Sequence, residues 1–199
     1  MRNRKDEIVY ATLELAAENG LRSVSMQQIA SKVGITKASL YNHFASKEDI
    51  VDAMYEVIRN ASKEKNQTEP LDYDRLTPDI PLAVILGSAV SSYRKLVNDP
   101  EMFCFYKVIM SERAINPAAA EIMVRETQTM IHATKTLFYA LQVKGIADLG
   151  NVDAVAFSFA MTAHSIIDYE CDLRHAGIES EKDLMQEYID EFCRIYAKA

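Results

Sequence analysis

The most constraining feature of the sequence is a pair of helix-start signals at Ser25 and Thr36, only eleven residues apart. Gln28 follows Ser25 by three residues, which is the spacing of a capping box. Gly34 lies between the two signals and predicts the end of the first helix, because glycine readily adopts the left-handed conformation that often closes a helix. The chain is therefore expected to form two short helices joined by a tight turn, which is a helix-turn-helix.

The rest of the chain also predicts helices, because no stretch alternates with the period of two that marks a strand. A helix over about 5–18 is expected to end with Gly20 in the left-handed conformation, and a fourth helix over about 46–63 is expected to begin at Ser46. Residues 64–81 are polar, hold three prolines and predict a linker. Further helices are expected over about 80–98, 100–115, 117–144, 152–176 and 181–197. The predicted fold is all-α, with a three-helix helix-turn-helix head (1–55), a connecting fourth helix and a larger helical body (80–199).

The second short helix has the surface of a helix that reads DNA. At 100° per residue, Leu40 and Phe44 point inward together, and Ala38 and Asn42 point away from them. A helix this short with a small, polar outer face contributes little to a core. It suits the major groove of DNA, which admits a helix whose N-terminal residues reach the base edges.

Lys37 and Lys47 each follow directly after an expected N-cap, where the partial positive charge of a helix N-terminus disfavours a cation. A bound phosphate reverses that preference, so the two lysines are interpreted as clamps on the DNA backbone. The alternative for a single lysine at such a position is simple solvation. Residues 1–47 hold seven basic and four acidic residues, a net charge of +3, so the rest of the chain carries −10 of the total −7. A basic head on an acidic body favours a polyanion as the partner of the head alone.

The segment SVSMQQIASKVGITKASLYNHFASKEDIV (residues 23–51) closely resembles the DNA-binding signature of the TetR family of bacterial transcriptional regulators. The resemblance covers about residues 5–55, and the glycine turn, LYNHF and SKEDI all fall at the family's spacing. It implies that double-stranded DNA is contacted by Ser25, Gln27, Thr36, Lys37, Ala38, Ser39, Tyr41, Asn42, His43 and Lys47. It also implies an all-α effector and dimerisation domain whose last two long helices pair across a two-fold axis.

The last two expected helices have the pattern that such a dimer needs. The helix over 181–197 has a broad apolar stripe, and the helix over 152–176 is apolar on more than one face. In that helix, Val155 and Phe159 can face the core while Phe157 and Met161 face elsewhere. Burial by the core on one side and by a second subunit on the other predicts a homodimer.

The body is also expected to enclose a pocket for a small, mostly apolar effector, in which a few polar groups fix the ligand. The expected lining residues are Tyr93, Phe103, Tyr106, Met110, Met130, Phe138, Phe157 and Met161, with His164 and Asp168 as polar anchors. The alternative for the aromatic and Met cluster over 101–110 is ordinary core. The alternatives for His164 and Asp168 are an i,i+4 pair at a dimer seam and a metal site.

These observations favour a ligand-responsive transcriptional regulator of the repressor type, and the alternative is a regulator controlled by a protein partner. An enzyme is not expected, because the sequence lacks a phosphate-binding glycine loop, HExxH, GxSxG and a clustered acid pair with a plausible nucleophile. No cofactor or metal is expected, since the three cysteines are far apart and fit reduced, mostly buried thiols. With no secretory signal and no apolar run long enough to span a bilayer, the expected location is the cytoplasm.

Overall fold

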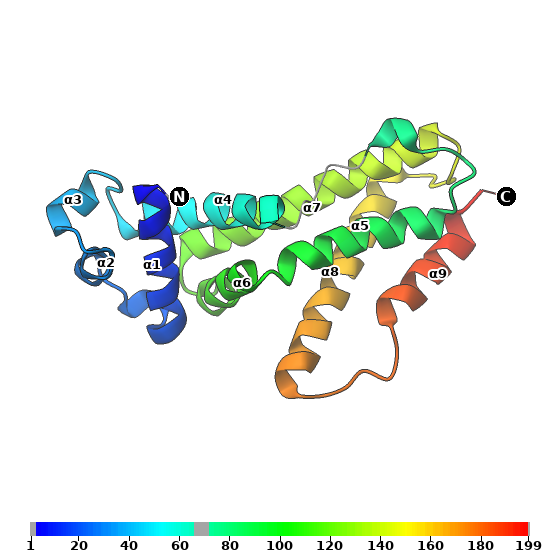
Figure 1. The fold of residues 1–199 in the computed structure, drawn as a ribbon. Helices are drawn as coiled ribbons and strands as arrows, with labels where there is room; N and C mark the ends of the chain where they lie inside the picture. The colour runs from blue at the N-terminus through cyan, green and yellow to red at the C-terminus, as the bar shows by residue number, and fades with distance from the viewer. Residues whose placement is uncertain (1–2, 66–71, 199) are drawn as a thin grey trace. The chain divides into compact units, whose positions relative to one another are not determined.

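The computed structural model describes residues 3–65 and 72–198, and its regular elements within these ranges are helices (Figure 1). One isolated antiparallel bridge joins Ala147 to Ala197. The predicted all-α fold is thereby confirmed. The α-helices are α1 (Arg4–Asn19), α2 (Met26–Val33), α3 (Lys37–Tyr41), α4 (Lys47–Lys65), α5 (Leu82–Val97), α6 (Pro100–Glu112), α7 (Pro117–Val143), α8 (Val152–Ala176) and α9 (Leu184–Tyr196), and the 3-10 turns are η1 (Leu21–Ser23) and η2 (Tyr73–Arg75).

The predicted helix limits agree with the observed ones to within three residues. Of the predicted linker 64–81, residues 66–71 lie outside the described residues, and η2 follows them. Gly20 differs from its prediction. Its φ is positive, at 77°, but its ψ of 142° lies outside the left-handed helical region. The chain turns into η1 directly after Gly20, and an extended ψ at a positive φ is open to glycine because it has no Cβ.

Contacts divide the chain into two compact units, and two of the helices contribute to both. The first unit contains residues 1–69 and 95–126, and the second contains residues 70–94 and 127–199. α5 and α7 therefore each begin in one unit and end in the other. The predicted division into a head at 1–55 and a body at 80–199 stays a functional prediction, because packing assigns residues 95–126 to the same unit as the head.

The first unit is built around one continuous hydrophobic core. α1 packs against α2, α4 and α6, and α2 packs against α3. The core includes Ile29 and Leu40 of the helix-turn-helix, and it continues through Met54 of α4 to Phe105 of α6 and Ile122 of α7. All five of these side chains are almost completely buried. The helices of the helix-turn-helix therefore share their core with α6 and the first turns of α7.

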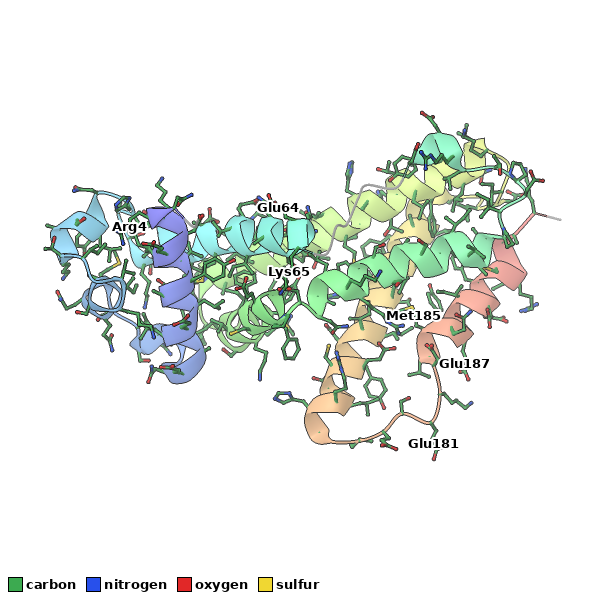
Figure 2. The ribbon with its side chains drawn as sticks, viewed as in Figure 1. Arg4, Glu64, Lys65, Glu181, Met185 and Glu187 are labelled. Atoms are coloured by element: carbon green, nitrogen blue, oxygen red, sulfur yellow. The ribbon has the colours of Figure 1, made fainter. Side chains whose placement is uncertain are left out.

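Polar contacts also connect α6 to the N-terminal helices of the first unit. Asp99 caps α6 by accepting hydrogen bonds from the amides of Glu101 and Met102. The ammonium of Lys65 at the end of α4 (Figure 2) lies 2.7 Å from the Asp99 carboxylate. Burial alone raises the pKa of Asp99, but the Lys65 ammonium and the two amides together hold that pKa below its ordinary value. From α1, the Tyr10 hydroxyl donates to the Glu101 carboxylate at 3.0 Å.

A buried ion pair joins α4 to α7 within the first unit. The Arg59 guanidinium lies 2.6 Å from Oε1 of Glu126, and the Tyr55 hydroxyl donates to Oε2 of the same carboxylate at 2.7 Å. The Arg59 and Glu126 side chains are 9% and 2% exposed. Arg125 pairs with Asp52 and places its guanidinium carbon 5.1 Å from the centre of the Tyr55 ring. Asp52, Tyr55 and Arg59, which lie one and two turns apart on α4, thus all contact side chains of α7.

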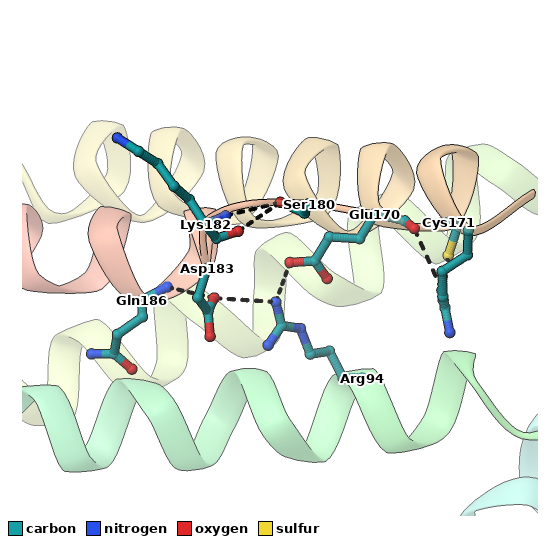
Figure 3. A network of polar contacts seen from close by, with 8 residues as sticks. Arg94, Glu170, Cys171, Ser180, Lys182, Asp183 and Gln186 are labelled. Atoms are coloured by element: carbon teal, nitrogen blue, oxygen red, sulfur yellow. Dashed lines mark hydrogen bonds and ion pairs between the residues drawn. The ribbon is translucent and has the colours of Figure 1, made fainter. Parts of the chain in front are cut away.

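The second unit holds an aromatic cluster formed by α7, α8 and α9. Phe192 of α9 lies at its centre, with ring centroids 4.9 Å from Phe159 and 5.5 Å from Phe138. Figure 3 shows a polar network in the same unit, in which Arg94 of α5 reaches both Glu170 of α8 and Asp183, the N-cap of α9. These contacts fix the last two long helices against the part of α5 that belongs to this unit.

None of the helices in the described ranges is both long enough and apolar enough to pass through a membrane. The three cysteines are free thiols, and they are half-buried, where the sequence predicted mostly buried ones. Burial raises the pKa of Cys104 and of Cys193, so both remain thiols near neutral pH.

Candidate nucleic-acid interface

The helix-turn-helix forms as its local sequence predicts. The Ser25 side chain accepts from the amide of Gln28, and the Gln28 side chain accepts from the amide of Ser25, which completes the capping box of α2. Gly34 ends α2 in the left-handed conformation, with φ 77° and ψ 33°. The next amide, of Ile35, donates to the Ala30 carbonyl at 3.0 Å, so the turn is a Schellman motif. This closed turn holds α3 at a fixed angle to α2.

The short α3 presents the face that the helical wheel predicts. Thr36 is its N-cap and accepts from the amide of Ser39 at 3.1 Å. Leu40 is fully buried, whereas Lys37, Ala38 and Asn42 are exposed. Regular helix ends at Tyr41, two to three residues before the predicted end. The amides of the next residues still bond to carbonyls of α3, so the end of the helix is a tightened turn.

The residues expected at the DNA lie on α2, on α3 and in the segments that flank them. Seven of the ten are exposed, and three are half-buried. The exposed residues are Ser25, Gln27, Thr36, Lys37, Ala38, Tyr41 and Asn42, and the half-buried residues are Ser39, His43 and Lys47. Of these, the hydroxyls of Ser25 and Thr36 already serve as helix caps, so their side chains position the backbone of the site. Whether these residues contact DNA stays a prediction.

The two lysines singled out in the sequence have different surroundings. In residues 3–65 and 72–198, the Lys37 ammonium has no carboxylate partner, and it lies 5.9 Å from the centre of the Tyr41 ring. By contrast, the Lys47 ammonium lies 3.0 Å from the carbonyl oxygens of Leu21 and Val24 and 3.5 Å from that of Arg22. Lys37 is thus free to meet a phosphate, whereas Lys47 is already coordinated by the backbone.

Two other cations of the N-terminal helices are paired with carboxylates. Arg4 forms an ion pair with Glu7 at 2.6 Å, and Lys32 forms one with Glu14 at 3.0 Å. The Glu14 hydrogen bond and charge raise the pKa of the Lys32 ammonium. Lys5 lies 5.7 Å from the centre of the Phe44 ring. Pairing with carboxylates lowers the positive field that these side chains offer, which leaves Lys37 as the most available cation beside α3.

Sequence reasoning missed the contacts of Lys47 and the buried pair of Arg59 and Glu126. The contact between Lys47 and Val24 spans 23 positions, and the contact between Arg59 and Glu126 spans 67 positions, so no local pattern identifies the partner in either one. One signal for the buried pair was present in the sequence. Tyr55 and Arg59 lie along the same side of α4 as the buried Val51 and Ile58, where a free charge is disfavoured.

The ten residues proposed to line an effector pocket fall into both compact units. Three belong to the first unit and seven to the second, and they are named in that order: Phe103, Tyr106 and Met110, then Tyr93, Met130, Phe138, Phe157, Met161, His164 and Asp168. Phe138 lies in the aromatic cluster, and Phe157 of α8 is 50% exposed. For all ten residues, a common pocket therefore stays a prediction.

His164 and Asp168 form the i,i+4 contact that the sequence allowed. His164 Nε2 lies 3.5 Å from Asp168 Oδ2 on α8. The His164 side chain is 18% exposed, and its Nδ1 atom is buried without a hydrogen-bond partner in the part of the chain that the structure describes. Buried polar atoms in folded proteins nearly always have a partner, so this nitrogen is a candidate anchor for a bound molecule.

Comparison with known proteins agrees with this geometry. Residues 8–54 match the family described as "Bacterial regulatory proteins, tetR family". The chain is 42% identical over 52 residues to the transcriptional repressor KstR2 of Mycobacterium tuberculosis, a match that spans 26% of each protein. It is 27% identical over 186 residues to the transcriptional regulator UidR of Escherichia coli, which spans 92% of this chain and 85% of UidR. The solved SmeT–triclosan complex has the same fold, with a TM-score of 0.71 and 14% identity over 98% of this chain and 91% of SmeT.

Fold, turn geometry and sequence match together define a helix-turn-helix DNA-binding domain on an all-α chain. Residues 8–54 place this N-terminal domain in the TetR family of bacterial transcriptional regulators.

Proposed function

We propose that the chain is a ligand-responsive transcriptional repressor that binds a palindromic operator as a homodimer in the cytoplasm. The observation that carries the proposal is the outer face of α3, where Lys37, Ala38 and Asn42 are exposed beside a rigid Schellman turn. An exposed helix N-terminus with a free cation suits a DNA phosphate, and small and amide side chains suit base edges. The proposed contacts are Ser25, Gln27, Thr36, Lys37, Ala38, Ser39, Tyr41, Asn42 and His43.

A dimer is part of the proposal because one α3 is too short to select an operator. Its five residues reach only a few base pairs, whereas two copies related by a two-fold axis read both halves of a palindrome. α8 and α9 leave large apolar side chains at the surface, with Phe157, Tyr169 and Ile195 at 50%, 51% and 57% exposed. Apolar side chains of this size on two long helices support pairing with a second subunit.

The experiment that tests the function is selection of binding sites from random duplex DNA by the full chain. We expect an inverted repeat whose half-site centres lie one turn, about 34–36 Å, or a multiple of it apart. Sedimentation of the free protein at micromolar concentration is the control, and it should report twice the 22.4 kDa mass of one chain. Enrichment of a single unrepeated half-site, together with a 22.4 kDa species, would exclude the dimeric repressor.

An effector is proposed from the unsatisfied Nδ1 of His164 and from the triclosan bound by the structural relative SmeT. A ligand that supplies a polar partner to His164 and apolar contacts around it would bind the folded state selectively. Mass action then stabilises the protein by about 2.7 kcal/mol at a ligand concentration 100 times its Kd.

This effector hypothesis can be tested by screening small apolar compounds for a raised melting temperature and for a change in operator affinity. We expect His164→Leu to weaken the shift given by a binding compound. The same substitution at the exposed His175, on the same helix, should leave that shift unchanged. If no compound binds while a protein from the same cell changes operator affinity, control by a protein partner is the correct alternative.

A further inference from the structure

The Lys47 ammonium occupies a site made of backbone carbonyl groups. Leu21, Arg22 and Val24 supply the three oxygen atoms, at 3.0, 3.5 and 3.0 Å. All three residues lie in or directly after η1, the 3-10 turn that connects α1 to α2. An ammonium group has three N–H donors and no acceptor, so its donors match this set in number and in kind.

This contact explains why a lysine is stable at the first position of α4. A cation is disfavoured there by the partial positive charge of the helix N-terminus. The Lys47 side chain crosses instead to the end of η1, where backbone carbonyl groups carry partial negative charge; the Leu21 carbonyl also accepts from the amide of Val24. Charge-assisted hydrogen bonds are stronger than neutral ones, so they outweigh the unfavourable helix position.

The contact also fixes the reading helix indirectly. Val24 is followed at once by Ser25, the N-cap of α2, so holding the Val24 carbonyl sets where α2 begins relative to α4. The Schellman turn at Gly34 then transmits the position of α2 to α3. A DNA phosphate that bound the Lys47 ammonium would remove its hydrogen bonds to these carbonyls.

We propose that Lys47 is a positioning residue, which places α2 and α3 against α4 through the carbonyls of Leu21, Arg22 and Val24 and does not neutralise a DNA phosphate. The inference rests on the proposed DNA binding for its consequence and on the backbone contacts for its structural basis. The two lysines look equivalent in sequence, but this proposal gives them different roles. Lys37 supplies charge to the DNA, and Lys47 supplies geometry to the domain.

The test compares Lys47→Met with Lys37→Met in the full chain, because methionine keeps an unbranched apolar stem and removes the ammonium. Without DNA, Lys47→Met should lower the melting temperature by about 2–4 °C, and Lys37→Met should leave it unchanged. With DNA, Lys37→Met should reduce the slope of log affinity against log salt by about 0.9 for each phosphate that is no longer neutralised. Lys47→Met should leave that slope unchanged.

A positioning role also predicts a change in DNA specificity, which a loss of stability alone does not cause. At a temperature where Lys47→Met is fully folded, its ratio of specific to non-specific affinity should fall about tenfold, because misplaced side chains no longer reach the bases but still reach the phosphates. Lys47→Arg restores donors to the carbonyls, so it should recover much of that ratio; this variant also serves if Lys47→Met does not fold.

A salt slope that falls in Lys47→Met as it does in Lys37→Met, with melting temperature and specificity ratio unchanged, would overturn the proposal. An unchanged melting temperature in Lys47→Met would overturn it even without DNA. If the wild-type chain binds no duplex DNA, the proposed function fails, and the melting temperatures still decide whether Lys47 holds η1 against α4.

Discussion

Replacing Glu126 by alanine is expected to destabilise the protein by about 3–5 kcal/mol. The reason is the charge that the substitution leaves behind. Arg59 keeps its guanidinium inside the first unit, where only 9% of its side chain is exposed, and it loses the carboxylate that compensates it. The Tyr55 hydroxyl loses its acceptor in the same step. The measurement is the free energy of unfolding in urea, followed by circular dichroism.

Two controls separate this cause from simple loss of packing. The double variant Arg59→Met/Glu126→Leu removes both charges and fills similar volume, so it should be much closer to the wild type than Glu126→Ala. Glu191→Ala breaks the exposed pair between Arg194 and Glu191, and it should have no measurable effect on unfolding. If the double variant is as unstable as the single one, weaker packing rather than an uncompensated charge explains the result.

Lys37→Glu is expected to weaken binding to every duplex sequence, roughly 100-fold for a dimer if each reversed lysine costs roughly 10-fold at low salt. The negative side chain repels the phosphate that the lysine is proposed to attract. Each subunit of the dimer then leaves one phosphate without its cation, and at about 0.9 per phosphate the salt slope should fall by about 1.8. Titration of labelled operator and of unrelated duplex, at several salt concentrations, measures both quantities.

The matched variants for this experiment are Asn42→Ala and Lys144→Glu. Asn42→Ala should change which base is preferred, by about 1–3 kcal/mol at one position of each half-site, with the salt slope intact. Lys144→Glu reverses an exposed lysine outside the first unit and tests the effect of net charge alone. Equal reductions in affinity for Lys37→Glu and Lys144→Glu would show that no phosphate lies near Lys37.

The parts of the fold that the sequence predicts well are those encoded by neighbouring residues. Ser25, Thr36 and Ser46 act as caps within their own first turns, and Ser46 forms a reciprocal pair with Asp49 at 3.0 Å. The turn at Gly34 is equally local. Helix limits and the exposed face of α3 follow from such short-range rules, which is why they agree with the structure.

The parts that the sequence does not predict depend on contacts between distant residues. A helical wheel identifies an apolar face, but it does not say which helix covers that face. The contacts of Phe138 with Phe159 and Phe192 in an aromatic cluster, for example, could not be read from the sequence. In the same way, Lys47 was interpreted from its place on a helix, whereas its ammonium contacts carbonyls more than 20 positions earlier.

The core that α1–α4 share with α6 and the start of α7 limits how DNA specificity can be exchanged between related regulators. If residues 1–55 of another regulator replace those of this chain, the new helices must pack against Met102, Phe105 and Ile109 of this chain. These three side chains fit the original α1 and α4. A graft that keeps the interior intact carries residues 1–69 and 95–126, and two of its three junctions then fall within α5 and α7. A few surface substitutions on α3 disturb nothing beneath them. Exchanging the whole first unit between two regulators thus needs three coordinated junctions. Changing the preferred operator sequence needs only point substitutions on α3.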